Sequence, residues 1–328
     1  MTTHAPALQT PLPSSTRDRA LFLFRRRNRP GGANDSRAHE GLIMTPRSEP
    51  IVPVRLAALR DRLTAEDEVI LKALATVHLA TTGQLQRLTL DRQPVRTAEV
   101  LTAQRLQRLR RLGLTAAFLR RPSDRRPGRP GYLHALTADG RVLAGGRYAI
   151  GGERPRKTWR PGDQFVAHRL GITELYVRLV ERSRIGGPTV RQFQAEPDSW
   201  RTYTGPDGER LVIRPDALVR LEQAGLEVSW FCEIDRASEP ARTLAGKCQA
   251  YRAYELSGVE QRRHQVFPAV AFIVPGGPRL RLVERVIARQ PDSARSLFVV
   301  ATEADAVDRL ADPDQANPTP GPREDAAA

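Results

Sequence analysis

The sequence predicts an α/β protein, α+β overall, made of two domains, and three observations support this prediction. Its 328 residues are enough for two ordinary domains with separate cores. Helix signals run through residues 56–112 and are followed by two short strands on either side of a basic loop. Further on, a long helix precedes a β-rich stretch, after which helices and strands alternate. We expect domains at 56–146 and 164–312, a basic linker at 147–163, and disordered tails at 1–55 and 313–328.

Composition and charge indicate a cytoplasmic protein with an anionic partner. The chain has 52 Lys and Arg against 37 Asp and Glu, a formal net charge of +15, and nearly all of the basic residues are arginine. No apolar run approaches the ~20 residues that span a bilayer, so we expect no membrane partner. Cys232 and Cys248 lack metal-site spacing and are expected to be reduced thiols that pack as small apolar side chains.

The first domain is predicted to contain three helices before its strands. Thr64 is followed by acidic residues and then by apolar residues at helical spacing, which is typical of a capped helix start. Thr81 and Thr82 cap a second short helix, and the third begins at Pro94 and ends at Gly113. The remaining elements are strands at 114–120 and 132–136 and a fourth helix capped by Thr137. This is the order of a winged helix-turn-helix.

The third helix has an apolar side and a polar side. The apolar side consists of Ala98, Leu101, Leu106, Leu109 and Leu112. Arginine and glutamine, which bind guanine and adenine edges in the major groove, gather on the other side. The candidates for DNA contact on this helix are Arg96, Gln104, Gln107, Arg110 and Arg111. We therefore expect double-stranded DNA as the partner.

The loop between the two strands corresponds to the wing, and it is strongly basic. From Val95 to Gly131 there are ten arginines against Glu99 and Asp124. Phosphate contacts from such a loop position a domain on DNA without specifying the sequence. The candidates in the wing are Arg121, Arg125, Arg126 and Arg129. The alternative is a winged helix that contacts protein, with its arginines merely solvated.

The second domain is predicted to be helix, three strands, helix, strand, followed by a further helix, strand and helix. The first helix covers 164–184 and has an apolar stripe, with His168 and Glu174 as weak candidates for a site. The strands are expected at 190–195, 211–221, 226–235, 266–274 and 296–301. The later helices are expected at 241–256, after Pro278 and after Thr302.

Two carboxylates lie inside the apolar runs of the hairpin expected over 211–235. Asp216 belongs to its first strand and Glu233 to its second. A carboxylate there is costly to bury unless it is paired, hydrogen-bonded or bound to a cation, and two on neighbouring strands repel each other. The pair indicates either a shared cation or carboxylates of which one faces solvent or pairs with an arginine.

A proline precedes the first of these acids, as Pro215-Asp216, and Asp235 follows Glu233 by two residues. Together with the αβββαβ order, this pattern resembles the restriction-endonuclease-like fold. In that fold the two acids bind Mg²⁺ and a lysine two residues beyond the second acid completes the motif. The resemblance implies Asp216 and Glu233 as Mg²⁺ ligands. Asp235 stands in the lysine position, so Lys247 on the following helix is the candidate for the positive charge.

Short motifs distributed over both domains form a second pattern. They are Leu63-Thr-Ala-Glu-Asp67, Leu79-Ala-Thr-Thr-Gly-Gln-Leu85, Arg105-Leu-Gln-Arg-Leu109, Tyr132-Leu-His-Ala-Leu-Thr137, His168-Arg-Leu170, Arg214-Pro-Asp-Ala217 and Phe231-Cys-Glu-Ile-Asp235. In this order they resemble the replication-relaxation family of plasmids and integrated elements, over residues 56–281. The resemblance implies a DNA-binding protein of a mobile element, with other plasmid replication or transfer proteins as further partners.

These patterns leave three functions open. The first is a DNA-binding accessory protein of plasmid or mobile-element replication and relaxation. The second is a Mg²⁺-dependent nuclease or nickase that uses Asp216 and Glu233. The third is a transcriptional repressor whose second domain dimerises, so a homodimer is also open. Asp235 in the lysine position favours binding over cleavage, because the loss of one catalytic group is costly.

Overall fold

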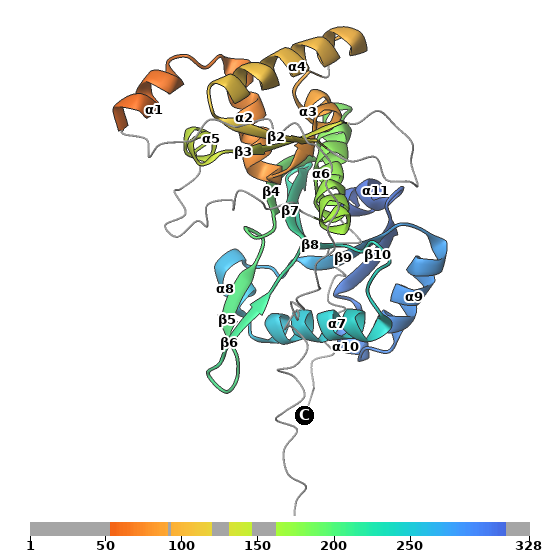
Figure 1. The fold of residues 1–328 in the computed structure, drawn as a ribbon. Coiled ribbons are helices and arrows are strands. Elements are labelled where there is room, and N and C mark those ends of the chain that lie inside the picture. Colours follow the sequence, from red (N-terminus) through yellow and green to blue (C-terminus); the bar gives the residue numbers. More distant parts are fainter. Residues whose placement is uncertain (1–52, 91–92, 120–130, 146–161, 313–328) are drawn as a thin grey trace, which may run out of the picture. The chain divides into compact units, whose positions relative to one another are not determined.

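The computed structural model describes residues 53–90, 93–119, 131–145 and 162–312 (Figure 1). The predicted tails and linker lie almost wholly outside these residues, and so does the wing with its four candidate arginines. Helix α1 (Pro53–Arg60) begins slightly ahead of the expected first domain. Within the described ranges, no helix is both long enough and apolar enough to cross a membrane.

The four predicted helices of the first domain begin and end where local signals predict, and α1 is an additional helix that was not predicted. These helices are α1, α2 (Ala65–Val77), α3 (Thr82–Thr89), α4 (Val95–Arg111) and α5 (Ala138–Leu143). At the start of α2 the Thr64 hydroxyl accepts the amide hydrogen bond of Asp67, whose carboxylate accepts that of Thr64. Thr81 and Gln84 form the same reciprocal cap on α3. Gly113, just past α4, has the positive φ of 76° that favours glycine at a helix end.

A three-stranded antiparallel sheet completes the first domain. Its strands are β1 (Ala80–Thr81), β2 (Thr115–Leu119) and β3 (Tyr132–Leu136), in the order β1-β3-β2. Helix α4 turns Ala98, Thr102, Leu106 and Leu109 inward, and its leucines pack with those of α2 and α3. The predicted apolar side of α4 is thus confirmed in its centre, whereas Leu101 and Leu112 are only half-buried.

The second domain is built on a mixed five-stranded sheet with the order β10-β9-β8-β7-β4. Its strands are β4 (Thr189–Ala195), β7 (Ala217–Gln223), β8 (Leu226–Ile234), β9 (Ala269–Val274) and β10 (Phe298–Thr302). β4, β7 and β8 pair antiparallel, and β8, β9 and β10 pair parallel. β4 is therefore an edge strand, and β8, which is nearly all buried, lies at the centre.

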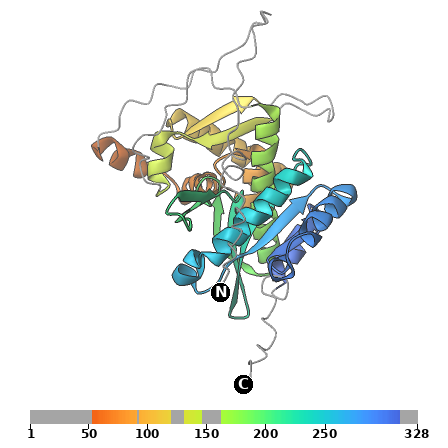
Figure 2. The ribbon, with the colours of Figure 1, turned by 90° about the horizontal axis from the view of Figure 1, so that it is seen from below.

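Helices cover both faces of this sheet. α6 (Asp163–Arg184) and α11 (Ala306–Ala311) pack on one face, together with the inward side chains of β4, β7 and β8. α7 (Ala241–Leu256) and α9 (Gly277–Ala288) pack on the other, and they lie side by side, cyan and blue in Figure 2. Short helices α8 (Val259–His264) and α10 (Asp292–Arg295) follow α7 and α9. Both cysteines are free and buried, as predicted.

One predicted strand is wrong. The stretch 211–221 was expected to form a single strand, but it divides into β6 (Arg210–Ile213) and β7. β6 pairs with the unpredicted β5 (Arg201–Thr204) in a separate hairpin that extends away from the main sheet (Figure 1). The division falls at Pro215, which has no backbone N–H to donate to a sheet. The turn between β7 and β8 is also tighter than expected, with Ala224 and Gly225 both at positive φ.

Helix α6 packs into the cores of both domains. Its residues Ile172 and Leu175 belong to the core under the large sheet, while Val177 belongs to the core of the first domain. Polar contacts join the same surfaces, because Arg87 of α3 forms ion pairs with Glu174 and Glu181 of α6, each at 2.6 Å. The described parts of the two predicted domains are therefore joined through α6, and they belong to one compact unit.

Candidate functional site

Asp216 is fixed by the backbone at the point where β7 begins. Its N–H donates to the carbonyl of Cys232 at 3.0 Å, and its Oδ2 accepts the N–H of Ile234 at 2.6 Å. Both partners belong to β8, so Asp216 is held against the end of the neighbouring strand. The residue is 7% exposed. One oxygen is thus committed to the backbone, and the other faces the side chains around it.

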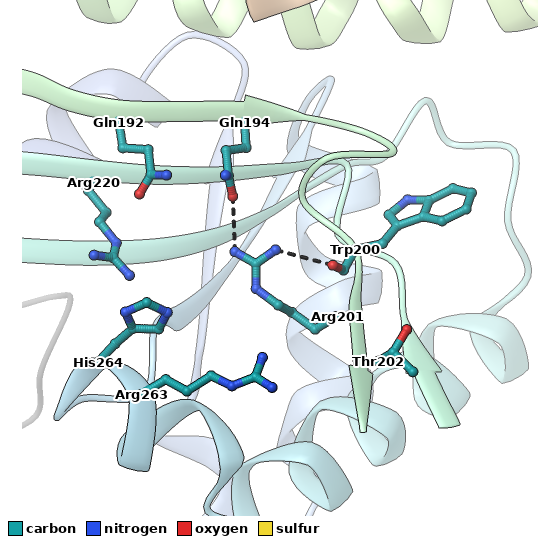
Figure 3. A pocket seen from close by; sticks show the side chains of 8 residues that line it. All are labelled: Gln192, Gln194, Trp200, Arg201, Thr202, Arg220, Arg263 and His264. Atoms are coloured by element: carbon teal, nitrogen blue, oxygen red, sulfur yellow. Dashed lines mark hydrogen bonds between the residues drawn. The ribbon is translucent and has the colours of Figure 1, made fainter. Parts of the chain in front are cut away.

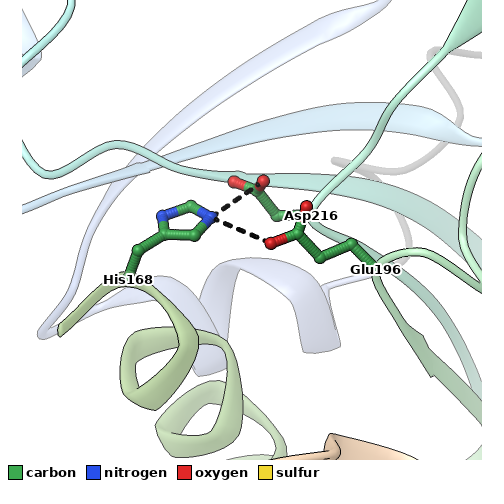
Figure 4. A group of neighbouring side chains, drawn as sticks. All are labelled: His168, Glu196 and Asp216. Atoms are coloured by element: carbon green, nitrogen blue, oxygen red, sulfur yellow. Dashed lines mark hydrogen bonds and ion pairs between the residues drawn. The ribbon is translucent and has the colours of Figure 1, made fainter. Parts of the chain in front are cut away.

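His168 and Glu196 face the free side of Asp216 (Figure 4). His168 Nε2 lies 3.1 Å from Asp216 Oδ1 and 3.7 Å from Glu196 Oε1. Glu196 follows β4 and is held by Arg169, whose Nη1 is 3.2 Å from Glu196 Oε1 and donates to the Glu196 carbonyl at 2.6 Å. One ring nitrogen and two carboxylate oxygens lie within 4.8 Å of one another. Burial disfavours the imidazolium, but the hydrogen bond and charge of Asp216 and the charge of Glu196 raise the pKa of His168.

Glu233 occupies the other half of the site and is 2% exposed. Its Oε2 accepts a hydrogen bond from Lys247 Nζ at 2.8 Å, and its Oε1 accepts one from the Tyr251 hydroxyl at 2.5 Å. Burial raises the pKa of Glu233, and Lys247 opposes that rise. Burial likewise disfavours the Lys247 ammonium, but the charges of Glu233, Asp216 and Glu239 raise the pKa of Lys247, so it stays positive.

Asp235 points to a different partner. Its Oδ2 accepts a hydrogen bond from Arg279 Nε at 2.5 Å, and its Oδ1 accepts one from the Ala237 N–H at 2.8 Å. Arg279 belongs to α9 and also donates to the carbonyl of Glu239 at 2.7 Å. The residue in the lysine position of the motif therefore ties the end of β8 to α9 instead of facing Lys247.

The structure thus brings together three of the four predicted catalytic candidates. The charge of Asp216 acts on both Glu233 and Lys247, while Asp235 is held apart by Arg279. The side chains gathered directly at Asp216 are His168 and Glu196, whereas both oxygens of Glu233 are hydrogen-bonded to protein. That Asp216 and Glu233 bind one metal ion together therefore stays a prediction.

The donor set around Asp216 fits a divalent cation. Two carboxylates and one imidazole suit Mn²⁺ and related ions, and carboxylates with water suit Mg²⁺. Sequence reasoning treated His168 only as a weak candidate and did not consider Glu196. The only signal in the sequence was that Glu196 directly follows the strand predicted at 190–195, and its position near Asp216 depends on the pairing of β4 with β7.

The DNA-binding candidates of α4 lie on its outer side. Arg96, Gln104, Gln107 and Arg111 are exposed, and Arg110 is half-buried. Arg111 also borders a cavity of about 410 Å³ at the end of the helix. The other arginines at this cavity are Arg55, Arg62 and Arg108.

A scan against known protein families matches the replication-relaxation family over residues 71–270. The match begins in α2 and ends in β9, so it includes α4, His168, Asp216 and Glu233. No curated protein and no solved structure matches the chain. Because the match covers more than half of the sequence and both described domains, the chain belongs to the replication-relaxation family, and its role is related to replication or relaxation.

Proposed function

We propose that this protein is a DNA-binding accessory factor of plasmid or mobile-element replication and relaxation, which holds duplex DNA with α4 and the loop after β2. The observation that supports this most is the arrangement of α4. Its buried row packs in the core, and its opposite side presents arginine and glutamine to solvent. Such side chains bind base edges and phosphates, and a helix of this kind fits the major groove.

Contacts with the core of the first domain hold α4 in place on the side opposite its exposed arginines and glutamines. Arg108 forms an ion pair with the buried Asp67, which itself caps α2. Arg108 also donates a hydrogen bond to the carbonyl of Arg62. The exposed arginines therefore belong to a helix that uses another arginine, Arg108, for its own packing, and positive charge accumulates in its last turn, where it attracts phosphates.

DNA binding by the full chain is the test of this proposal. We expect the affinity for duplex DNA to fall steeply as salt is added, because phosphate contacts release counterions. Arg96→Ala and Arg111→Ala should weaken binding and relax the preference for sequence, whereas Arg125→Ala and Arg126→Ala should weaken binding to all sequences alike. An affinity that does not change with salt contradicts the proposal.

A second candidate, a metal-dependent nuclease or nickase, is favoured by one specific observation. Asp216, Glu196 and His168 converge with a donor set that fits Mg²⁺ or Mn²⁺. When bound there, such an ion supplies a Lewis acid for phosphodiester chemistry. The chain itself provides Lys247, a cation held beside Asp216 and Glu233 that is suited to a negatively charged phosphate.

Supercoiled plasmid distinguishes the two candidates. The protein is incubated with Mg²⁺ or Mn²⁺, then with EDTA, next to an Asp216→Asn variant. Nicking that both EDTA and Asp216→Asn abolish identifies an enzyme. Binding without nicking leaves the accessory role, and nicking that persists in Asp216→Asn excludes this site.

A further inference from the structure

A second polar site lies at the edge of the large sheet, beneath β4. It is a cavity of about 460 Å³ between β4, β7, the start of β5 and the end of α8 (Figure 3). Nearly all of its lining is polar, and six of the side chains are Gln192, Gln194, Arg201, Arg220, Arg263 and His264. Its volume is within the range of small-ligand sites, about 300–1,000 Å³.

The sheet forms one wall of this cavity with a polar row. Gln192 of β4 pairs with Arg220 of β7, which pairs with Ser229 of β8. Leu218 and Phe231 lie on the same face, two positions further along their strands, and both are fully buried in the core beneath α7. The polar row therefore runs from the edge strand β4 to the central strand β8, across a face that elsewhere packs against helices.

Arg201 is the rigid part of the cavity. Its Nη2 donates to Gln194 Oε1 at 3.0 Å and its Nη1 to the Ser199 carbonyl at 2.9 Å. Its guanidinium carbon lies 5.9 Å from the centre of the Phe231 ring. These contacts fix a positive charge in one place, with 14% of the side chain exposed.

The other cations around the cavity retain donors for a ligand. Arg220 Nε is buried and has no hydrogen-bond partner within the described residues, and Arg220 Nη1 is 3.7 Å from Glu227. Arg263 is exposed on α8 and points into the same space (Figure 3). The buried Glu260 accepts the Tyr254 hydroxyl and forms an ion pair with Arg201, with Arg201 Nε 3.6 Å from its Oε2, so it offsets the charge of Arg201 and leaves Arg220 and Arg263 as the main cations for a ligand. Guanidinium donors that meet in a polar cavity match the oxygens of a phosphate.

We propose that this cavity binds a phosphate group of a DNA strand, an inference that rests on the proposed function in taking DNA as the partner. The segment from Glu196 to Arg201 supports DNA over a free anion. It begins at the acidic cluster, ends in the cavity, and is tied to Pro215 by the Ser199 hydroxyl at 2.5 Å. The same short segment thus borders both sites, so we infer that a strand held by the cavity extends along this segment towards Asp216.

Fluorescence anisotropy with the full chain and a labelled single-stranded oligonucleotide tests the cavity. We expect Arg263→Gln and Arg220→Gln each to weaken this binding by about five- to tenfold. Arg285→Gln, which removes an exposed charge from α9, is the matched control and should change it little. Arg263→Gln is the decisive variant, because its exposed side chain can be replaced without disturbing the core.

Three results overturn the proposal. The first is unchanged single-strand binding in Arg263→Gln, and the second is an equal loss in Arg285→Gln. The third is competition by thymidine monophosphate or inorganic phosphate as strong as that by the unlabelled oligonucleotide, which identifies a free phosphate as the ligand. Duplex binding by α4 is measured separately with Arg96→Ala and Arg111→Ala. A failure of the cavity is thereby distinguished from a failure of the proposed function.

Discussion

His134 in the first domain and His168 in the second lie in opposite electrostatic surroundings. Burial, and then the charge of Arg110, lower the pKa of His134 to about 4, and its Nε2 is 3.0 Å from the Thr82 hydroxyl. His168 is also largely buried, yet Asp216 and Glu196 raise its pKa. Burial and the cation Arg110 thus act on His134 in the same direction, whereas at His168 two carboxylates outweigh burial. The two buried histidines therefore titrate in opposite directions from the ordinary value.

The arginines of α4 and α6 differ in a related way. On α6, Arg169 and Arg178 donate to backbone carbonyls at the ends of strands, and Arg182 pairs with Asp308. On α4, Arg96 and Arg111 are exposed. These arginines of α6 thus stabilise the fold, whereas on α4 Arg108 does so but Arg96 and Arg111 are exposed to solvent, where a ligand can reach them.

The largest expected effect is the acid sensitivity that comes from His134. Its folded pKa is below the unfolded value, so protonation favours unfolding and stability is lost as the pH falls from about 6.5 towards 4. We expect this to account for on the order of 2–3 kcal/mol at the acid end. Urea unfolding of His134→Gln and of the unchanged protein across this pH range measures it.

His168 provides the opposite control. Its folded pKa is raised, so its contribution is fully present below the unfolded pKa and is lost as the pH rises through the folded pKa. His168→Gln should therefore lower the free energy of unfolding below about pH 6.5, where the contribution is present, and leave it unchanged at alkaline pH, where the contribution is already lost. His134→Gln should instead raise the free energy of unfolding at acid pH, so a change in the same direction in both variants would show that the comparison of the two histidines is wrong.

Arg169→Gln is expected to be next in size. It removes both contacts to Glu196 and leaves a half-buried carboxylate without its cation. We expect a loss of about 2 kcal/mol in the free energy of unfolding. Arg96→Ala, on the exposed row of α4, is the matched control and should stay within ~0.5 kcal/mol of the unchanged protein. Equal losses would show that the two helices use their arginines alike.

A smaller effect is expected on DNA affinity. Arg96→Ala with Arg111→Ala should weaken duplex binding about tenfold, or ~1.4 kcal/mol, while the melting temperature stays the same. Competition binding with several duplex sequences checks both affinity and preference. A variant that keeps full affinity while Arg169→Gln loses it would place the DNA on the other side of the molecule.

The smallest expected effect is stabilisation by metal. A cation that binds Asp216, Glu196 and His168 only in the folded state raises stability by mass action, here by ~0.5–1 kcal/mol, or about 2 °C in melting temperature. Melting curves with and without Mn²⁺ measure it, and Asp216→Asn should abolish the rise. Glu233→Gln should reduce the metal-induced rise only if Glu233 is a ligand. It therefore distinguishes a site made of Asp216, Glu196 and His168 from one made of Asp216 and Glu233.

Local physics allowed much of this protein to be predicted from its sequence. The caps at Thr64, Thr81 and Thr137 appear where expected, because a hydroxyl that accepts the amide of the third following residue needs no distant partner. Helical spacing predicted which side of α4 is buried. Asp216 and Glu233 were found because carboxylates are rare in apolar runs.

Only the tertiary structure decided which side chains meet. Glu196 lies near Asp216 because β4 pairs with β7, and Asp235 faces Arg279 because α9 packs beside the end of β8. Gln192 and Arg220 likewise lie side by side only because of the register in which β4 pairs with β7. These contacts join residues far apart in the chain. Periodicity predicts which face of a helix or strand a residue lies on, but it does not identify the element that packs against that face.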